Sequence, residues 1–441
     1  MKPLFEFVRL CVLILLSVFM LQACRTGTGI FGKKSPHEQY GEKLTGAGLR
    51  ETALGRAWFD AANRSLSSPL AIAIPYKETG YFAADQPNAA GLRFQARQGE
   101  KLNILLDKRP ADGFTVYLEL WKVPGSTDQK PKLVAAADTL KHVIEHEVDE
   151  QTTFIIRVQP ELLKGGEYTL SISAGPSLAY PIRAPGKNHT QSFWGDPRDG
   201  GGRKHEGIDM FAPKLTPVVA AADGRVTRVN ENNLGGKVVW MRPEKKDYVL
   251  YYAHLDQQLV TDGQIVKAGD TLGLMGNTGN AQYTSPHLHF GIYTSGGPVD
   301  PFPFVNPEVR TPNGISAPLN KIGTFVRAGG RQTKLYASLD SPVTTLLPQH
   351  TLLKVQAATA DWYKVHLPDG TKGLVRSNEA ANATEIRKQV IKSEQPVFDA
   401  PDSLAPRKKM IKAGEAVSIL AAFNDYYFVR TEPDITGWIR K

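Results

Sequence analysis

The sequence predicts a mainly β protein divided into several small domains. The chain of 441 residues contains 40 glycines and 30 prolines, and both residue types favour turns over long helices. Between these turns, short segments such as residues 92–96 and 102–106 alternate apolar and polar positions, which is the period of a strand with one buried face. A chain of this length exceeds what one hydrophobic core usually serves, so we expect about three domains.

Residues 1–23 are predicted to be an export signal. Lys2 and Arg9 flank the start of an apolar stretch at 10–21, which is too short to cross a bilayer comfortably. Residues 21–24, Leu-Gln-Ala-Cys, follow directly and resemble the bacterial lipobox, in which the signal is cut before a cysteine that then carries lipid. We therefore expect a lipoprotein lipidated on Cys24. The alternative is a membrane anchor that is never cleaved.

The cysteine content agrees with this prediction. Cys11 lies inside the apolar stretch and would be removed with the signal, which leaves Cys24 as the one cysteine of the mature chain and excludes an internal disulfide. Acyl chains on this thiol would anchor the protein to a membrane. Arg25 follows Cys24 where an aspartate would favour inner-membrane retention in enterobacterial sorting. We expect a protein of the cell envelope, on the outer membrane facing the periplasm.

The N-terminal half after the signal is predicted to hold a tether and a sandwich. Residues 24–48 are polar and read as a linker, and residues 49–185 combine a short helical pattern with regularly spaced strands. These strands loosely resemble the pre-peptidase β-sandwich of secreted bacterial proteases. We expect this domain to act as a spacer rather than to bind a ligand. His142 and His146 lack a third ligand nearby, so we expect them on the surface.

The C-terminal part contains an internal repeat. Residues 361–365 and 373–376 recur at 425–429 and 437–440, with the same offset of 64 residues. The units, at 321–380 and 389–441, resemble bacterial SH3-like barrels. Four aromatic residues in them could stack on a ligand, although we expect at least half to be core: Trp362, Tyr363, Tyr426 and Tyr427.

Two pairs of polar residues in the middle segment have the spacing of metal ligands. His287 and His289 would share one face of a strand, with Leu288 packed behind it. His205 and Asp209 lie four apart, but Gly207 and a nearby proline argue against a helix, so we expect a loop that runs into a strand. A catalytic zinc has three protein ligands and one open position. His205 and Asp209, together with one histidine of the other pair, would supply these three ligands.

The whole middle segment resembles the lysostaphin-type, or LytM-like, zinc peptidases. The similarity covers residues 193–302 and includes the ordered motifs H-x-x-x-D at 205–209, Y-x-H-L at 252–255, G-x-T-G at 276–279 and H-L-H-F at 287–290. It implies an antiparallel peptidase domain at 186–310 that binds Zn²⁺ through His205, Asp209 and His289. It implies that His254 and His287 are catalytic.

The resemblance and the export signal together predict an endopeptidase that cleaves peptide cross-links of peptidoglycan. One of the two catalytic histidines would accept the proton of the attacking water, and the other would hold that water or stabilise the oxyanion. A wall-binding lipoprotein that regulates amidases, or an exported protease acting on proteins, are the alternatives. Family members of the regulatory kind typically lack ligands, and this chain retains all of them.

Other sequence features bear on the partners and on the groove. The net charge of +9 suits an anionic partner such as the cell wall, and the absence of an arginine-rich run with aromatics argues against nucleic acid. Three departures from the family pattern affect the predicted groove: a longer segment at 280–285, Gly291 in place of an acidic residue, and Leu215 in place of glycine. The short connection at 181–186 suggests that neighbouring domains cover the groove.

Overall fold

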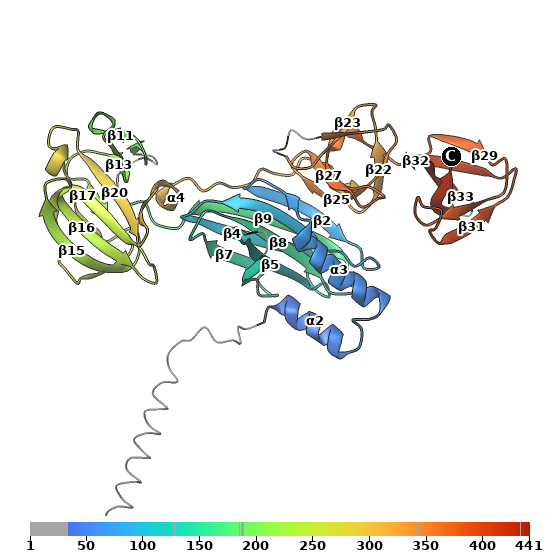
Figure 1. Ribbon diagram of the computed structural model, residues 1–441, viewed down its shortest axis with the longest axis horizontal. Helices are drawn as coiled ribbons and strands as arrows, with labels where there is room; N and C mark the ends of the chain where they lie inside the picture. The colour runs from blue at the N-terminus through green and yellow to red at the C-terminus, as the bar shows by residue number, and fades with distance from the viewer. Residues whose placement is uncertain are drawn as a thin grey trace, which may run out of the picture.

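The computed structural model describes residues 34–126, 129–184, 186, 189–339, 341, 344–432 and 434–441. The predicted signal at 1–23 and the predicted lipidation site Cys24 lie outside the described residues. Strands form most of the regular structure, which confirms the mainly β prediction (Figure 1). Within the described ranges, no helix is both long enough and apolar enough to span a bilayer.

Two helices precede the first sheet, and the prediction of a plain linker over 24–48 is wrong for its second half. Helix α2 (Pro36–Gly46) begins after Ser35, whose hydroxyl accepts a hydrogen bond from the Glu38 amide at 3.1 Å. Helix α3 (Ala53–Ser67) carries Trp58, which is 1% exposed and donates its indole N–H to the Pro160 carbonyl. Helix α2 was not predicted because its apolar periodicity is weak. Packing, rather than helix propensity, stabilises it.

The sandwich predicted for the N-terminal half is present as two facing sheets around one core. One sheet has the order β1-β3-β8-β5-β6: Leu70–Ala71, Ala90–Ala96, Thr152–Pro160, Val116–Val123 and Lys132–Ala136. The other includes β2-β9-β4-β7: Tyr76–Phe82, Gly166–Pro176, Glu100–Arg109 and Val143–Glu147. His142 is buried with a φ of 51°, so the predicted surface position is wrong for it, and His146 lies on β7 against the Phe154 ring.

The middle segment forms a separate ten-stranded antiparallel sheet with its own core. Its main path is β10-β13-β20-β17-β16-β15-β18: Thr190–Ser192, Ile208–Phe211, His287–Thr294, Val249–Gln258, Gly236–Pro243, Gly224–Asn232 and Ile265–Val266. Three further strands pair beside this path: β14 (Pro217–Val219), β19 (Thr271–Met275) and β21 (Gly297–Val299). A hairpin, β11 (Pro197–Arg198) with β12 (Arg203–Lys204), precedes β13, and the short helix α4 (Phe302–Val305) follows β21.

The first C-terminal repeat continues a sheet of the sandwich. Its strand β25 (Leu352–Thr359) pairs with β2, so that Thr79 lies opposite Ala358. The remaining strands of this repeat are β22 (Phe325–Ala328), β23 (Thr333–Tyr336), β24 (Thr344–Leu347), β26 (Trp362–His366), β27 (Lys372–Arg376) and β28 (Ala380–Asn382). This edge pairing joins two units that the sequence predicts as separate.

The second repeat forms a six-stranded sheet of order β29-β32-β33-β34-β30-β31: Arg387–Val390, Ala416–Phe423, Tyr426–Thr431, Ile435–Arg440, Gln395–Phe398 and Arg407–Ile411. The recurring segments occupy equivalent strands, because β26 pairs between β25 and β27 as β33 does between β32 and β34. Trp362 and Tyr363 are buried, whereas Tyr426 and Tyr427 are half-buried, so two of the four aromatics are core as expected.

Candidate metal centre

The pairing of β13 with β20 brings the two predicted ligand pairs together. Asp209 lies directly opposite His289 in this antiparallel ladder, and Met210 lies opposite Leu288. Because alternate residues of a strand face opposite sides, Asp209 and His289 project into the groove while Met210 and Leu288, both fully buried, pack into the core. His205 stands in the loop before β13, as the glycine and proline in that stretch predict.

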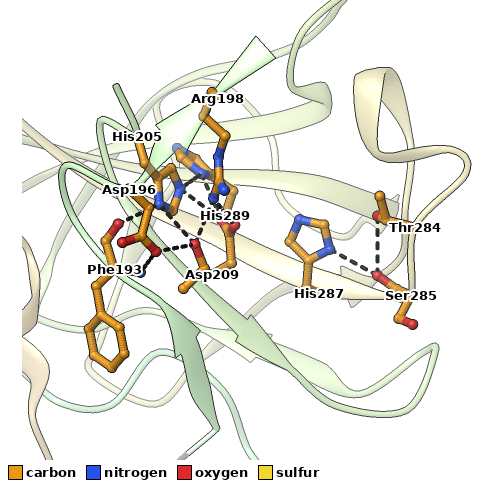
Figure 2. Close-up of polar contacts among 10 residues, drawn as sticks. Phe193, Asp196, Arg198, His205, Asp209, Thr284, Ser285, His287 and His289 are labelled. Atoms are coloured by element: carbon orange, nitrogen blue, oxygen red, sulfur yellow. Dashed lines mark hydrogen bonds and ion pairs between the residues drawn. The ribbon is translucent and has the colours of Figure 1, made fainter. Parts of the chain in front are cut away.

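Three ligand atoms converge at this point (Figure 2). His205 Nε2, His289 Nδ1 and Asp209 Oδ1 lie 3.0 Å from one another in each pairing. Ligand atoms about 2.0–2.1 Å from a tetrahedral zinc are about 3.3 Å apart, so this trio needs only a small outward adjustment to hold the ion. Two imidazole nitrogens and one carboxylate oxygen are also the donor types that suit zinc.

The loop before β13 fixes His205 in the orientation that a metal ligand needs. Its Nδ1 lies 2.9 Å from the Phe193 carbonyl oxygen, so a neutral ring donates there and leaves the Nε2 lone pair directed at the other ligands. Gly207 is required beside it, because a Cβ at that position would lie 2.6 Å from the His289 ring. This contact explains why glycine separates His205 from Asp209.

Arg198, on β11, holds the second oxygen of the carboxylate ligand. Its guanidinium nitrogen donates to Asp209 Oδ2 at 2.6 Å and to the Ser192 hydroxyl at 2.7 Å. Oδ1 of Asp209 is thereby left to face the two histidines. Arg198 was not predicted from the sequence, because nothing in its spacing indicates that β11 folds back over β13.

The surroundings of Asp209 keep its carboxylate ionised. Burial would raise the pKa of Asp209, but the contacts of its Oδ1 with the His205 and His289 rings outweigh burial and hold the pKa well below its usual range. Burial lowers the pKa of His289, although its contact with Asp209 opposes that effect. At neutral pH the centre therefore contains an ionised carboxylate, which suits it to hold a cation.

The two remaining predicted histidines lie beside the trio and face the same groove. The rings of His254 and His287 are 4.9 Å apart, and His254 is 5.9 Å from the ring of His289. The Nδ1 of His254 lies 2.9 Å from the Thr278 carbonyl, and that of His287 lies 2.9 Å from the Ser285 carbonyl. In its neutral form each ring donates from Nδ1 and keeps the lone pair on Nε2.

His254 shows signs of a specialised position. Burial, followed by the nearby His287 and His289, lowers the pKa of His254 to about 4, which keeps its imidazole neutral at physiological pH. Its φ of 63° places a non-glycine residue in the left-handed region, and its amide donates to the Gly235 carbonyl at 2.8 Å. Strain of this kind persists where the surrounding structure holds it, and it concentrates at functional sites.

A cavity of about 600 Å³ surrounds these five residues, and all of its lining residues fall between positions 192 and 293. Among the described residues, neither the sandwich nor the C-terminal repeats line it. The prediction that neighbouring domains cover the groove is therefore wrong for this structure, in which the middle segment stands at one end of the molecule (Figure 1).

One wall of the cavity is aromatic and was not predicted. Trp240 lies opposite Tyr251 across β16 and β17, and the Tyr293 ring contacts both. Gly291, which departs from the family pattern, faces this wall, because a Cβ there would lie 2.9 Å from the Tyr293 ring. The longer segment at 280–285 contributes Asn280, Ala281 and Thr284 to the cavity, and so lies at the groove as expected.

An antiparallel sheet that carries a His-Asp-His cluster and two further histidines in an open groove has the residues of a metallopeptidase site. Comparison with known families is consistent with this class, since residues 203–301 match the model of Peptidase family M23. The chain thus contains a peptidase domain of the M23, LytM-like type. The match covers the four histidines and the aspartate described above.

Individual proteins are similar to part of the chain. Peptidoglycan DD-endopeptidase ShyC of Vibrio cholerae is 39% identical over 94 residues, which is 21% of this chain and 21% of that protein. The murein hydrolase activator NlpD of Salmonella dublin is 33% identical over 154 residues, covering 30% of this chain and 40% of that protein. The solved structure of LytU is 38% identical and covers 28% of this chain and 86% of that one, with a TM-score of 0.25. Less than half of each of these two curated relatives is covered.

Proposed function

We propose that the protein is a zinc-dependent endopeptidase that hydrolyses peptide cross-links of peptidoglycan. The observation that carries this proposal is the complete set of three ligand atoms, each 3.0 Å from the others, at the base of an open groove. Proteins named as peptidoglycan or L-Ala–D-Glu endopeptidases are similar to 21–28% of the chain, which supports the proposal. The aromatic wall and the cavity give an extended peptide room to lie beside the ligands.

The chain's own residues have separable roles in such a reaction. Zinc, when bound by His205, Asp209 and His289, would polarise the scissile carbonyl and lower the pKa of a bound water. His287 lines the groove, and because its Nδ1 faces the Ser285 carbonyl, its Nε2 can accept a proton from the attacking water. His254 presents a second neutral ring, suited to holding that water or stabilising the oxyanion.

The second candidate function is a wall-binding protein that activates amidases without cleaving anything itself. The similarity to NlpD favours it, since that relative is named as an activator. The three retained ligands and the two further histidines beside them favour an enzyme, because an activator has no need for a complete set of ligands and catalytic groups.

We extend the proposal to the location and the outer parts of the chain. The lipobox-like sequence supports lipid attachment at Cys24 and an outer-membrane position facing the periplasm, with peptidoglycan as the partner and no role for nucleic acid. We assign residues 49–185 to the sandwich domain, 186–310 to the peptidase domain, and 321–380 and 389–441 to SH3-like repeats. The repeat in the sequence and the equivalent strands support the last assignment.

Digestion of purified sacculi tests the function. We expect the full chain loaded with one zinc to release soluble peptidoglycan fragments without any added amidase. His205→Ala should lose both the zinc and the activity, whereas His189→Ala, a histidine at the edge of the same sheet, should retain both. Solubilisation that occurs only after an amidase is added, and equally with His205→Ala, would favour the activator.

A further inference from the structure

A second cavity, of about 540 Å³, lies where the sandwich meets both C-terminal repeats. Its lining comes from three stretches of the chain, within 81–88, 323–368 and 399–438, and shares no residue with the cavity at the metal centre. We call it the junction groove. A small adjoining hollow shares Tyr81, Asn88, Gln356 and His366 with it and adds Lys372.

The walls of the junction groove are held together by specific contacts. The pairing of β2 with β25 makes the sandwich and the first repeat one sheet. Across that seam the fully buried Glu78 accepts hydrogen bonds from Lys364 on both carboxylate oxygens at 2.7 Å. The second repeat is attached by the Ala422 amide, which donates to the His350 carbonyl. A groove between units fixed in this way is formed before any ligand arrives.

Basic side chains stand side by side along this seam. Lys354, His366 and Lys372 lie directly opposite one another on β25, β26 and β27, and we call these three residues the basic row. Like charges opposite one another in a sheet are destabilising. Burial, followed by Lys372, Lys364 and Lys354, lowers the pKa of His366 to about 4, so the imidazole between the lysines stays uncharged.

Little negative charge compensates the basic row. Within the described part of the chain Lys372 is half-buried and takes part in no ion pair, and Lys354 donates to the neutral amide oxygen of Gln86 at 2.6 Å. The acids close by are already paired or exposed: Glu78 pairs with Lys364, Asp399 of the groove pairs with Lys408 at 2.7 Å, and Asp85 acts on Lys354 from an exposed position. Among the described residues, two half-buried lysines on the strands that flank β26 are therefore left without an ion-pair partner, and an anionic ligand can supply one.

The rest of the junction groove suits a peptide. Phe325 and Tyr81 are each 44% exposed, and Phe325 contacts the more deeply buried Phe428. The amides of Asn88 and Gln356 bond each other at 3.2 Å and line the groove. Exposed rings provide apolar contact area, and side-chain amides can pair with the N–H and C=O groups of a backbone.

We propose that the junction groove binds a short acidic peptide. Its carboxylates lie against Lys354 in the groove and Lys372 in the adjoining hollow, and its backbone runs along the amides and exposed rings. Charge complementarity selects this occupant: a carboxylate supplies the charge that the basic row lacks, whereas a neutral glycan could use the rings but would leave the row uncompensated. The stem peptides of peptidoglycan have this chemistry. Binding here is independent of the proposed peptidase activity, because the two cavities share no residue.

Calorimetric titration of the full chain with a stem tetrapeptide bearing free carboxylates, and with its fully amidated counterpart, tests the proposal. We expect the double variant Lys354→Gln/Lys372→Gln to bind the acidic peptide at least about tenfold more weakly, as the loss of charge-assisted hydrogen bonds implies. The amidated peptide should bind the unaltered chain weakly, and equally in the double variant.

Two control variants distinguish binding in the junction groove from a general charge effect and from binding at the metal centre. Lys334→Gln/Lys388→Gln removes the same charge from exposed positions outside the groove and should leave affinity unchanged. Asp209→Ala should also bind normally, because it alters only the metal centre. The melting temperature of Lys354→Gln/Lys372→Gln should be equal to or above that of the unaltered chain, since the substitutions remove two half-buried positive charges.

Several results would overturn the proposal. An equal loss in the Lys334→Gln/Lys388→Gln control would show a nonspecific charge effect. Loss of binding in Asp209→Ala would place the peptide at the metal centre. Tight binding of a neutral N-acetylglucosamine tetrasaccharide, unaffected by Lys354→Gln/Lys372→Gln, would identify a glycan site. Absence of any measurable binding of the acidic peptide would also contradict it.

Discussion

Replacing Arg198 with alanine should weaken the metal centre without removing a ligand. Arg198 donates to Asp209 Oδ2 at 2.6 Å, and the Asp209 side chain is only 9% exposed. Without the guanidinium, Oδ2 loses its partner and the carboxylate can turn away from His205 and His289. Loss of such supporting contacts typically lowers metal affinity about 10–100-fold. Because the Arg198 side chain is itself 31% exposed, water can replace part of the interaction. We therefore expect zinc affinity to fall about tenfold, which corresponds to about 1.4 kcal/mol of binding free energy.

Zinc affinity, measured by competition with a chelator of known affinity, gives this quantity without reference to activity. Arg225→Ala is the matched control, because Arg225 belongs to the same sheet and bonds the Gly263 carbonyl far from the ligands. Cleavage by Arg198→Ala should recover as zinc is raised. Unchanged zinc affinity together with lost cleavage at saturating zinc would refute the reasoning and would make Arg198 a substrate contact.

Three other perturbations have outcomes set by the structure. Burial, and then Arg157, lowers the pKa of His37 from 6.5 to about 4, so this group's contribution to stability is complete above pH 6.5 and declines by at most about 3 kcal/mol as the pH falls to about 4; urea unfolding at several pH values should show this decline, and His37→Asn should flatten it. Glu78→Gln should cost about 3–5 kcal/mol in thermal or urea unfolding because it leaves Lys364 buried without its partner, and a loss below about 1 kcal/mol would contradict the buried pairing. Cys24→Ser should move the protein from the membrane fraction to the soluble periplasm, and unchanged fractionation would argue against the lipid anchor.

The ligand pairs His205/Asp209 and His287/His289 could be predicted from sequence because the geometry within each pair is local. A histidine pair two residues apart shares a strand face wherever that strand lies, and Gly207 excludes a helix for His205 and Asp209. Residues brought in by register could not be predicted. Arg198 reaches Asp209 only because a hairpin folds over β13, and Trp240 meets Tyr251 only through the ladder of β16 and β17.

For the sandwich and the C-terminal repeats, too, local strands could be predicted from sequence but long-range pairing could not. Alternation and turn residues predict the strands of the sandwich and of the repeats, since those signals lie within each segment. The pairing of β2 with β25 joins residues more than 250 positions apart, and no local pattern predicts it. The sequence suggests a surface position for His142 and His146, yet His142 is buried where the chain turns, and the chain continues from it as β7.

Hydrolysis of one defined cross-linked muropeptide dimer in ¹⁸O-labelled water tests the proposed function most directly. With the zinc-loaded chain, mass spectrometry should show two monomers, one of which carries a single ¹⁸O in the newly formed carboxylate. His287→Ala should bind zinc normally but cleave about 10²–10⁴-fold more slowly, as expected for a lost general base. An intact dimer after prolonged incubation with the zinc-loaded chain would contradict the assignment of this groove as a peptidoglycan endopeptidase site.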